Sequence, residues 1–424
     1  MNWRSSSAVL AIAATATGGI ALLAIAWLAT RRLTGVELGF FFSFLSLGAF
    51  VQLADFGLSY AALQTGGRLA GTNRLHELPA IARHVTRWIT FSAGLATVAA
   101  GAIGFAIFSS RNAHAAGVAW TAPWLAYLVT VFALQVVTPG VFLREGSGKI
   151  LQMWRLRLVQ ELIGATACII ALNAGAGLWS LCAYAGTRAF VAALWLFLGD
   201  PLRSDDPAIT YSIRQWMTDV WPFQWKIGLS GLSGFLIFRS FAPIVLLEQG
   251  AIAAGSFGLA ISFMNLLIAV STSWPMSQAA RYSMLAASRR YEELHHDFPR
   301  MLWASTFASA AAAAFGVFVM AEARRRGVVF AQRLPEQLTT TVIFATAIVH
   351  HIVICFAVAL RAEGREPLLI PSVVGGIVNI AAIWLAAHYG TLRDIAVVNL
   401  ALALIGIPIA GLLLRARKRH LLAG

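Results

Sequence analysis

Basic side chains lie inside long apolar stretches of this 424-residue sequence. Arg188 stands in Ala-Gly-Thr-Arg-Ala-Phe and Arg239 in Leu-Ile-Phe-Arg-Ser-Phe, with Lys226 nearer the start of the same stretch as Arg239. A guanidinium in such surroundings must face a cavity or a partner, and its planar fork suits bidentate capture of phosphate. We expect all three residues to bind phosphate in a cavity. The alternatives are a structural ion pair for Arg188, snorkelling towards water for Arg239 and an interfacial anchor for Lys226.

Other polar side chains in apolar stretches are candidates for ion coupling or for lining a cavity. Asp55, in Leu-Ala-Asp-Phe-Gly-Leu, can pair with an arginine, carry a proton or cap a helix break beside Gly57. His350 and His351 are adjacent, so at most one of them is expected to face a cavity. Four amides either bond neighbouring helices or outline a polar lumen together with Arg188. These amides are Gln52, Gln135, Asn265 and Asn379.

The possible enzyme signatures in this sequence are incomplete. The run Gly146-Ser147-Gly148-Lys149 resembles the end of a phosphate loop, but Leu143 and Ile150 replace the required first Gly and final Ser or Thr. The cysteines lie in apolar runs without metal-ligand spacing and are expected to be packing residues. They are Cys168, Cys182 and Cys355. The sequence therefore predicts no catalytic residue, no metal site and no cofactor.

The composition determines which elements must position these side chains. Hydrophobic residues make up 59% of the chain and charged residues 12%, with 32 Lys and Arg against 18 Asp and Glu. A soluble domain cannot bury such an apolar excess. Unbroken apolar runs of about 20 residues indicate membrane-spanning helices, whereas a β-barrel has short alternating segments. The net charge of +14 is expected to meet anionic membrane lipid, and nucleic acid is not an expected partner.

Twelve apolar runs bounded by charged or Gly/Pro-rich breaks predict twelve spans. They cover residues 8–30, 38–63, 88–108, 120–143, 158–175, 178–198, 220–247, 252–276, 299–321, 339–360, 367–388 and 395–414. About two thirds of the 32 Lys and Arg residues fall on the side of the N-terminus, which predicts that both termini are cytoplasmic. One loop disagrees, because Arg324, Arg325 and Arg326 lie on the predicted outer side.

The spans divide into two halves. Residues 1–200 form a predicted N-terminal six-helix lobe, residues 201–219 a cytoplasmic linker and residues 220–424 a C-terminal six-helix lobe. An even split predicts parallel repeats related by a pseudo-two-fold axis along the membrane normal. Direct sequence support for the repeat is faint, since sliding the second span onto the eighth pairs little beyond Phe40 with Phe257 and Ala62 with Ala279.

Several short motifs resemble a known family of transporters. The second span begins Gly35-Val36-Glu37-Leu38-Gly39-Phe40 and continues to Asp55-Phe56-Gly57-Leu58 and small residues. The eighth span runs from Gly255-Ser256-Phe257-Gly258 to Trp274-Pro275, and Leu360-Arg361-Ala362-Glu363-Gly364-Arg365 follows the tenth. These patterns resemble the polysaccharide-precursor (O-antigen type) flippases of the multidrug/oligosaccharidyl-lipid/polysaccharide exporter superfamily.

That resemblance implies a multi-pass transporter of the bacterial inner membrane. It would move a polyprenyl-pyrophosphate-linked oligosaccharide from the inner to the outer leaflet by alternating access, and would not be an enzyme. The family's cationic lumen would correspond here to Arg188, Arg239 and Lys226. Its partners would be the lipid-linked oligosaccharide, membrane lipids, a polysaccharide polymerase and glycosyltransferases.

Two other functions stay open at this stage. A drug or cation antiporter of the same superfamily would place acidic residues in the cavity, which the two mid-depth arginines oppose. An integral-membrane polysaccharide polymerase would carry a large outer loop with catalytic residues, and only Glu322 to Gln337 is a candidate here.

Overall fold

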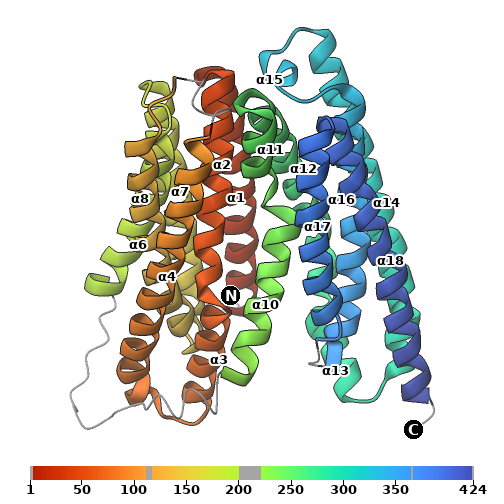
Figure 1. Cartoon of the computed structure of the whole chain (residues 1–424). Coiled ribbons are helices and arrows are strands. Elements are labelled where there is room, and N and C mark those ends of the chain that lie inside the picture. The colour runs from red at the N-terminus through yellow and green to blue at the C-terminus, as the bar shows by residue number, and fades with distance from the viewer. Residues whose placement is uncertain (1–2, 111–116, 200–220, 364–365, 423–424) are drawn as a thin grey trace.

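The computed structural model describes residues 3–110, 117–199, 221–363 and 366–422, and all of its regular elements are helices (Figure 1). The predicted linker 201–219 lies outside the described residues. The helices of the first half are α1 Trp3–Arg32, α2 Gly35–Gln52, η1 Leu53–Asp55, α3 Leu58–Gly71, η2 Leu75–Glu77, α4 Leu78–Phe108, α6 Thr121–Gly146, α7 Ile150–Asn173, α8 Trp179–Leu194 and the π-turn Trp195–Gly199. Those of the second are α10 Trp221–Phe238, α11 Phe241–Gln249, α12 Ala251–Ser277, α13 Ala279–Ala287, α14 Tyr291–Arg325, α15 Val329–Gln332, α16 Gln337–Leu360, η4 Arg361–Glu363, α17 Leu369–Tyr389 and α18 Leu392–Leu422.

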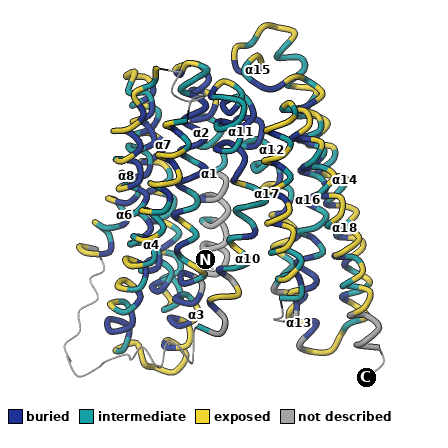
Figure 2. Tube along the Cα trace, viewed as in Figure 1, coloured by how far each residue is buried: buried dark blue, intermediate teal, exposed yellow. Residues whose placement is uncertain are grey.

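The predicted all-helical membrane architecture is confirmed. Ten helical segments are long and apolar enough to cross a bilayer, and α10 with α11, bent by 41°, gives an eleventh. The 30-residue helix α1 covers the first predicted span, residues 8–30. Helices α14, α17 and α18 turn apolar side chains such as Phe307, Ile370 and Leu412 outwards, whereas α2, α12 and α16 are mostly buried (Figure 2). This pattern is that of a bundle whose outer surface faces lipid.

Helix neighbours repeat between the two halves, as an internal duplication requires. Helix α1 packs on α7 as α10 packs on α17, and α7 packs on α8 as α17 packs on α18. The pairs α6 with α8 and α4 with α6 correspond to α16 with α18 and α14 with α16. The second span ends in the short helix α3 and the eighth in the short helix α13. The tertiary contacts thus reveal the repeat that the sequence barely shows.

An aromatic cluster fixes α2 within the first half. The Phe44 ring lies 4.8 Å from the Trp124 ring and 5.1 Å from that of Phe108, while Phe40 lies 5.4 Å from Phe108. Phe40, Phe44 and Phe108 are fully buried. Residues 40 and 44 share one face of the helix because they are one turn apart. The opposite face of α2 is therefore free to meet the second half.

That opposite face crosses α12 through glycines. A Cβ on Gly39 would collide with the backbone carbonyl of Ala251, and a Cβ on Gly255 would lie 2.9 Å from the Gly39 nitrogen. A Cβ on Gly258 would lie 2.6 Å from the Cβ of Phe42. Small residues at such crossings let two backbones approach closely. The crossing involves the ends of α2 and α12 that lie on the side of α15, opposite the C-terminus (Figure 1), and it joins the two halves there.

The arginines that disagreed with the charge rule have local structural roles. Arg324 donates to the carbonyls of Ala331 and Leu334, at 3.2 Å each, and so holds the turn around α15. Arg325 and Arg326 both pair with Glu322, one turn earlier on α14. Arginine in the last turn of a helix is also favourable towards the helix dipole. These cations are therefore explained by the C-terminus of α14, without any change in the predicted orientation.

We predict that Gly39→Ala opens the α2–α12 crossing on the outer side. The added methyl group overlaps the Ala251 backbone, and relieving such an overlap costs about 1–3 kcal/mol in the closed arrangement. The readout is labelling of Ser262→Cys, which faces the central cavity, by a membrane-impermeant thiol reagent added to whole cells. We expect labelling to rise by roughly fivefold or more.

Gly375→Ala is the matched control, because a Cβ there meets nothing within 4 Å. The background is the wild-type chain with its three cysteines. Unchanged outside labelling in Gly39→Ala, at normal protein level, would show that the crossing does not hold the outer side closed.

Candidate functional site

A cavity of about 1490 Å³ lies between the two halves. Its walls come from α1, α2, α6 and α8 of the first half and from α10, α11 and α12 of the second, with Ile354 from α16. Arg188 and Arg239 are the charged side chains among its described lining residues. The structure therefore brings together the two mid-depth arginines from opposite halves, and the cavity that contains them has positive charge.

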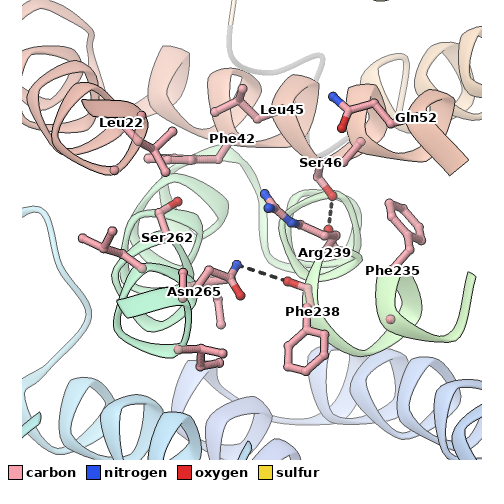
Figure 3. A pocket seen from close by; sticks show the side chains of 18 of the residues that line it. Leu22, Phe42, Leu45, Ser46, Gln52, Phe235, Phe238, Arg239, Ser262 and Asn265 are labelled. Carbon is pink, nitrogen blue, oxygen red and sulfur yellow. Dashed lines mark hydrogen bonds between the residues drawn. The ribbon is translucent and has the colours of Figure 1, made fainter. Parts of the chain in front are cut away.

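Arg239 stands at a break in the seventh span. Helix α10 ends at Phe238 and α11 begins at Phe241, with the 41° bend between them. The break leaves backbone carbonyls without helical partners, and side chains of two other helices supply donors (Figure 3). The Ser46 hydroxyl of α2 donates to the Arg239 carbonyl, and the Asn265 amide of α12 donates to the Phe238 carbonyl at 3.4 Å. Irregular backbone at this depth is tolerated where it lines a cavity and is satisfied in this way.

The Arg239 guanidinium extends from this break into the cavity (Figure 3). No hydrogen bond or ion pair joins it to any acceptor in the described part of the chain. A cation that is both within the membrane span and without a counter-ion is costly unless water or an anion meets it. Its position in the cavity lining leaves the phosphate-binding role of Arg239 a prediction.

Arg188 is held by an acidic partner that the sequence reasoning missed. Its guanidinium lies 2.5 Å from a carboxylate oxygen of Glu161 on α7, whose other oxygen accepts the Tyr184 hydroxyl at 2.9 Å. The structural-pair alternative therefore describes the resting position of Arg188, which still lines the cavity. The sequence held one sign that could have identified Glu161, because it is a lone carboxylate within the apolar fifth span. Its closeness to Arg188 depends on how α7 packs against α8.

The four amides divide between the cavity and the packing around it. Gln52 and Asn265 line the cavity as expected. Gln135 instead lines a smaller side pocket, and its amide donates to the Gln52 carbonyl at 3.4 Å. Asn379, on α17, is not among the cavity residues, because its amide donates to the Leu236 carbonyl of α10 at 3.0 Å. Fewer of the polar side chains therefore line the cavity than the sequence suggested.

Asp55 and Lys226 lie away from the cavity lining. The Asp55 carboxylate accepts the backbone N–H of Ser59 at 3.0 Å and its hydroxyl at 2.8 Å, so it caps α3 after the break in the second span. Phe56 and Gly57 at that break have positive φ angles, 40° and 76°. Lys226 is exposed near the start of α10, with its Nζ 5.9 Å from the Trp225 ring. The helix-cap and interfacial-anchor alternatives fit these two positions.

The two histidines are buried in different surroundings, as their adjacency predicted. The His351 Nε2 atom lies 3.0 Å from the Ser305 hydroxyl of α14 and 3.5 Å from the Cys355 sulfur. The His350 ring packs edge-on against Phe238, 4.6 Å away, and its Nε2 has no hydrogen-bond partner. Neither histidine is among the cavity lining residues, so a coupling role for either stays a prediction.

Comparison with known proteins shows a similarity of fold. No family model and no curated protein matches the sequence. Among solved structures, an inward-facing multidrug resistance MATE family transporter of the MOP superfamily matches with a TM-score of 0.71 and 14% identity, covering 96% of this chain and 99% of that one. An outward-facing transporter of the same description matches with a TM-score of 0.62 and 15% identity, over 98% and 96% of the two chains.

A third structure is a MOP superfamily transporter from Pyrococcus furiosus, with a TM-score of 0.56, 17% identity and coverage of 98% and 96%. For that protein, the reverse polarity of the binding pocket is said to suggest a different function. At these identities the likeness concerns architecture. The chain has the fold of the MATE family transporters of the MOP superfamily.

Proposed function

We propose that this protein moves a lipid-linked oligosaccharide, carried on a pyrophosphate, from the inner to the outer leaflet. The observation that carries the proposal is the guanidinium of Arg239, which has no partner among the described residues, in a cavity whose described charged lining residues are both arginines. Such a site stabilises an anion in place of the water that the anion loses. A pyrophosphate diester is an anion of this kind, and it must pass hydrocarbon that excludes it.

The cavity is also suited to the two unlike parts of such a substrate. Part of the lining, from α1 and α12, is apolar. Its residues include Gly18, Gly19, Ile20, Leu22, Leu23, Ile268, Ala269 and Val270. Other lining residues present hydroxyl, amide and guanidinium groups, among them Ser46, Tyr127, Arg239, and Ser262 and Asn265 of α12. We propose that the isoprenoid tail lies along the apolar part of the lining while the phosphates and sugars meet the polar groups.

The arrangement of the halves fits the start of an export cycle. The glycine crossing of α2 and α12 holds the halves together on the side of α15, which is the predicted outer side. The match to an inward-facing transporter has the higher TM-score, 0.71 against 0.62. Alternating access would follow from rocking the halves, with the cavity moving from one leaflet to the other.

A second candidate is a drug antiporter, because the inward- and outward-facing neighbours are both described as multidrug resistance transporters. Binding of cationic drugs needs an accessible acidic side chain. Glu161 is the nearest acidic group to the cavity arginines, but its charge is balanced by Arg188. The charge of the cavity therefore favours an anionic substrate over a cationic one.

The predicted outer loop gives little support to the polymerase alternative. Between α14 and α16 the chain forms only the short helix α15 and two turns. Three arginines of the region, Arg324 to Arg326, are already bonded to carbonyls or to Glu322. Catalytic basic groups would need to be free to meet a substrate.

We predict that Arg239→Gln strongly reduces export. Losing a charge-assisted bond to phosphate costs about 1.5–3 kcal/mol, which corresponds to a fall of roughly tenfold or more in transport. The measurement is surface polysaccharide in a strain lacking the native gene and expressing the variant at normal level. Arg393→Gln is the control, because it removes an exposed cation outside the cavity. Full export by Arg239→Gln would contradict the phosphate role.

We also predict the results of two assays that distinguish the candidate functions. Loss of the protein should cause lipid-linked repeat units to accumulate on the inner leaflet, because the exporter acts before the outer-leaflet steps. Expression in a pump-deficient host should leave tolerance to ethidium, a cationic drug, unchanged. Raised ethidium tolerance that increases further in Arg239→Gln would establish the drug antiporter, and unpolymerised single units on the cell surface would indicate the polymerase.

A further inference from the structure

The Arg188–Glu161 pair lies where the central cavity meets a second, more polar pocket. This side pocket has a volume of about 400 Å³ and is enclosed by α1, α2, α6, α7 and α8. Arg188, Gln52, Leu134 and Gly18 line both spaces, whereas Glu161 lines only the side pocket. The guanidinium of Arg188 is therefore accessible from the cavity, while the carboxylate that balances it is accessible from the side pocket.

Among the described residues, the charged and titratable groups around Glu161 are few, and each has an identified partner. On α8 they are Arg188 and Tyr184, both bonded to the carboxylate. On α7 itself Arg157 lines the same pocket, but it pairs with Glu145, at the end of α6, at 2.6 Å. Helix α1 presents Gly18, whose hypothetical Cβ would lie 3.7 Å from the Glu161 carboxyl carbon. Arg188 is thus the cation that balances Glu161.

Charge counting shows what the pair implies for an anion in the cavity. A pyrophosphate diester carries two negative charges, and Arg239 offers one free positive charge. Arg188 can supply the second, but its charge is already balanced by Glu161, so an anion held by both arginines leaves one negative charge in excess while the Glu161 carboxylate is ionised. A carboxylate left alone in a largely buried site is strongly disfavoured, and it is relieved by taking up a proton.

We infer that Glu161 is the proton-binding residue of this transporter and that it binds a proton when an anionic substrate takes over Arg188. This inference rests on the proposed function and adds the coupling ion to it. In the exchange, the Arg188–carboxylate pair breaks, a phosphate oxygen takes its place on the guanidinium, and an O–H bond forms on Glu161. One proton from water is consumed for each anion bound. Because linkage is reciprocal, the proton strengthens anion binding by the same factor as the anion strengthens proton binding.

The side pocket provides a route for that proton. It extends from Arg188 along α7 to Trp154 and Arg157, towards the end of α7 that begins at Ile150. Thr138, Gln135 and Gln160 add hydroxyl and amide groups along it. Proton entry by this pocket would not pass the substrate in the cavity.

The test is anion binding to the full chain in lipid nanodiscs at several pH values. The probe is citronellyl pyrophosphoryl-N-acetylglucosamine, a short-chain diester whose two charges do not titrate between about pH 5.5 and about pH 8. Wild-type affinity should rise as pH falls, by at most about tenfold per pH unit, the limit for one proton per anion. Glu161→Gln should bind with little pH dependence and, at about pH 8, roughly tenfold more tightly than wild type.

A second measurement follows the proton directly, by calorimetry in buffers of different ionisation enthalpy. Wild type should take up a proton on binding and Glu161→Gln should not, a difference that a merely structural role for Glu161 would not produce. Glu145→Gln is the matched control, since its carboxylate pairs with Arg157 in the same pocket, and it should keep the wild-type pH dependence.

The outcomes separate the inference from the proposed function. Unchanged pH dependence and proton uptake in Glu161→Gln would overturn the inference, while loss of binding in Arg239→Gln would still support the anion site. Failure of wild type to bind the probe at any pH would overturn the proposed function and the inference with it.

Discussion

Inside a bilayer every backbone carbonyl and N–H must find a partner within the protein, and the architecture of this chain follows from that constraint. Helices satisfy it almost everywhere. Where the seventh span breaks at Arg239, the freed carbonyls are satisfied by Ser46 and Asn265, which belong to different halves. The break is therefore stabilised only when α2 and α12 are both close to it. A change in how the halves sit would alter the bonding at the same place where the unpaired guanidinium meets the cavity.

The two cavity arginines differ in what surrounds them. Arg239 has no counter-ion among the described residues, so its charge is available at once to an anion. Arg188 is already balanced by Glu161. In the proposed function, Arg239 would attract the anion first, and the Arg188–Glu161 pair would then exchange its partner. The same pair also lowers the cost of keeping an arginine at this depth when the cavity is empty.

The lobes meet through glycines on the side of α15, which bears on the proposed rocking of the two halves. The glycines Gly39 and Gly255 allow close backbone contact there, and buried side chains such as Phe42 and Phe257 pack around it in one hydrophobic core. The aromatic cluster of Phe40, Phe44 and Trp124, by contrast, keeps α2 within its own half. One helix therefore has a face packed within its own half and a face that meets the other half, a division that suits the proposed rigid-body motion of the two halves.

The sequence alone determined the helical membrane fold and placed Arg188 and Arg239 within apolar segments, because apolar run length acts locally along the chain. It also contained the Gly35–Gly39 motif, but not what that motif touches. The tertiary structure decided that Arg188 is paired with Glu161, that Asn379 bonds a carbonyl outside the cavity and that Asp55 caps α3. These outcomes depend on the rotation of each helix about its axis and on which helices become neighbours. Those quantities are set by packing between distant segments, which no local pattern of residues records.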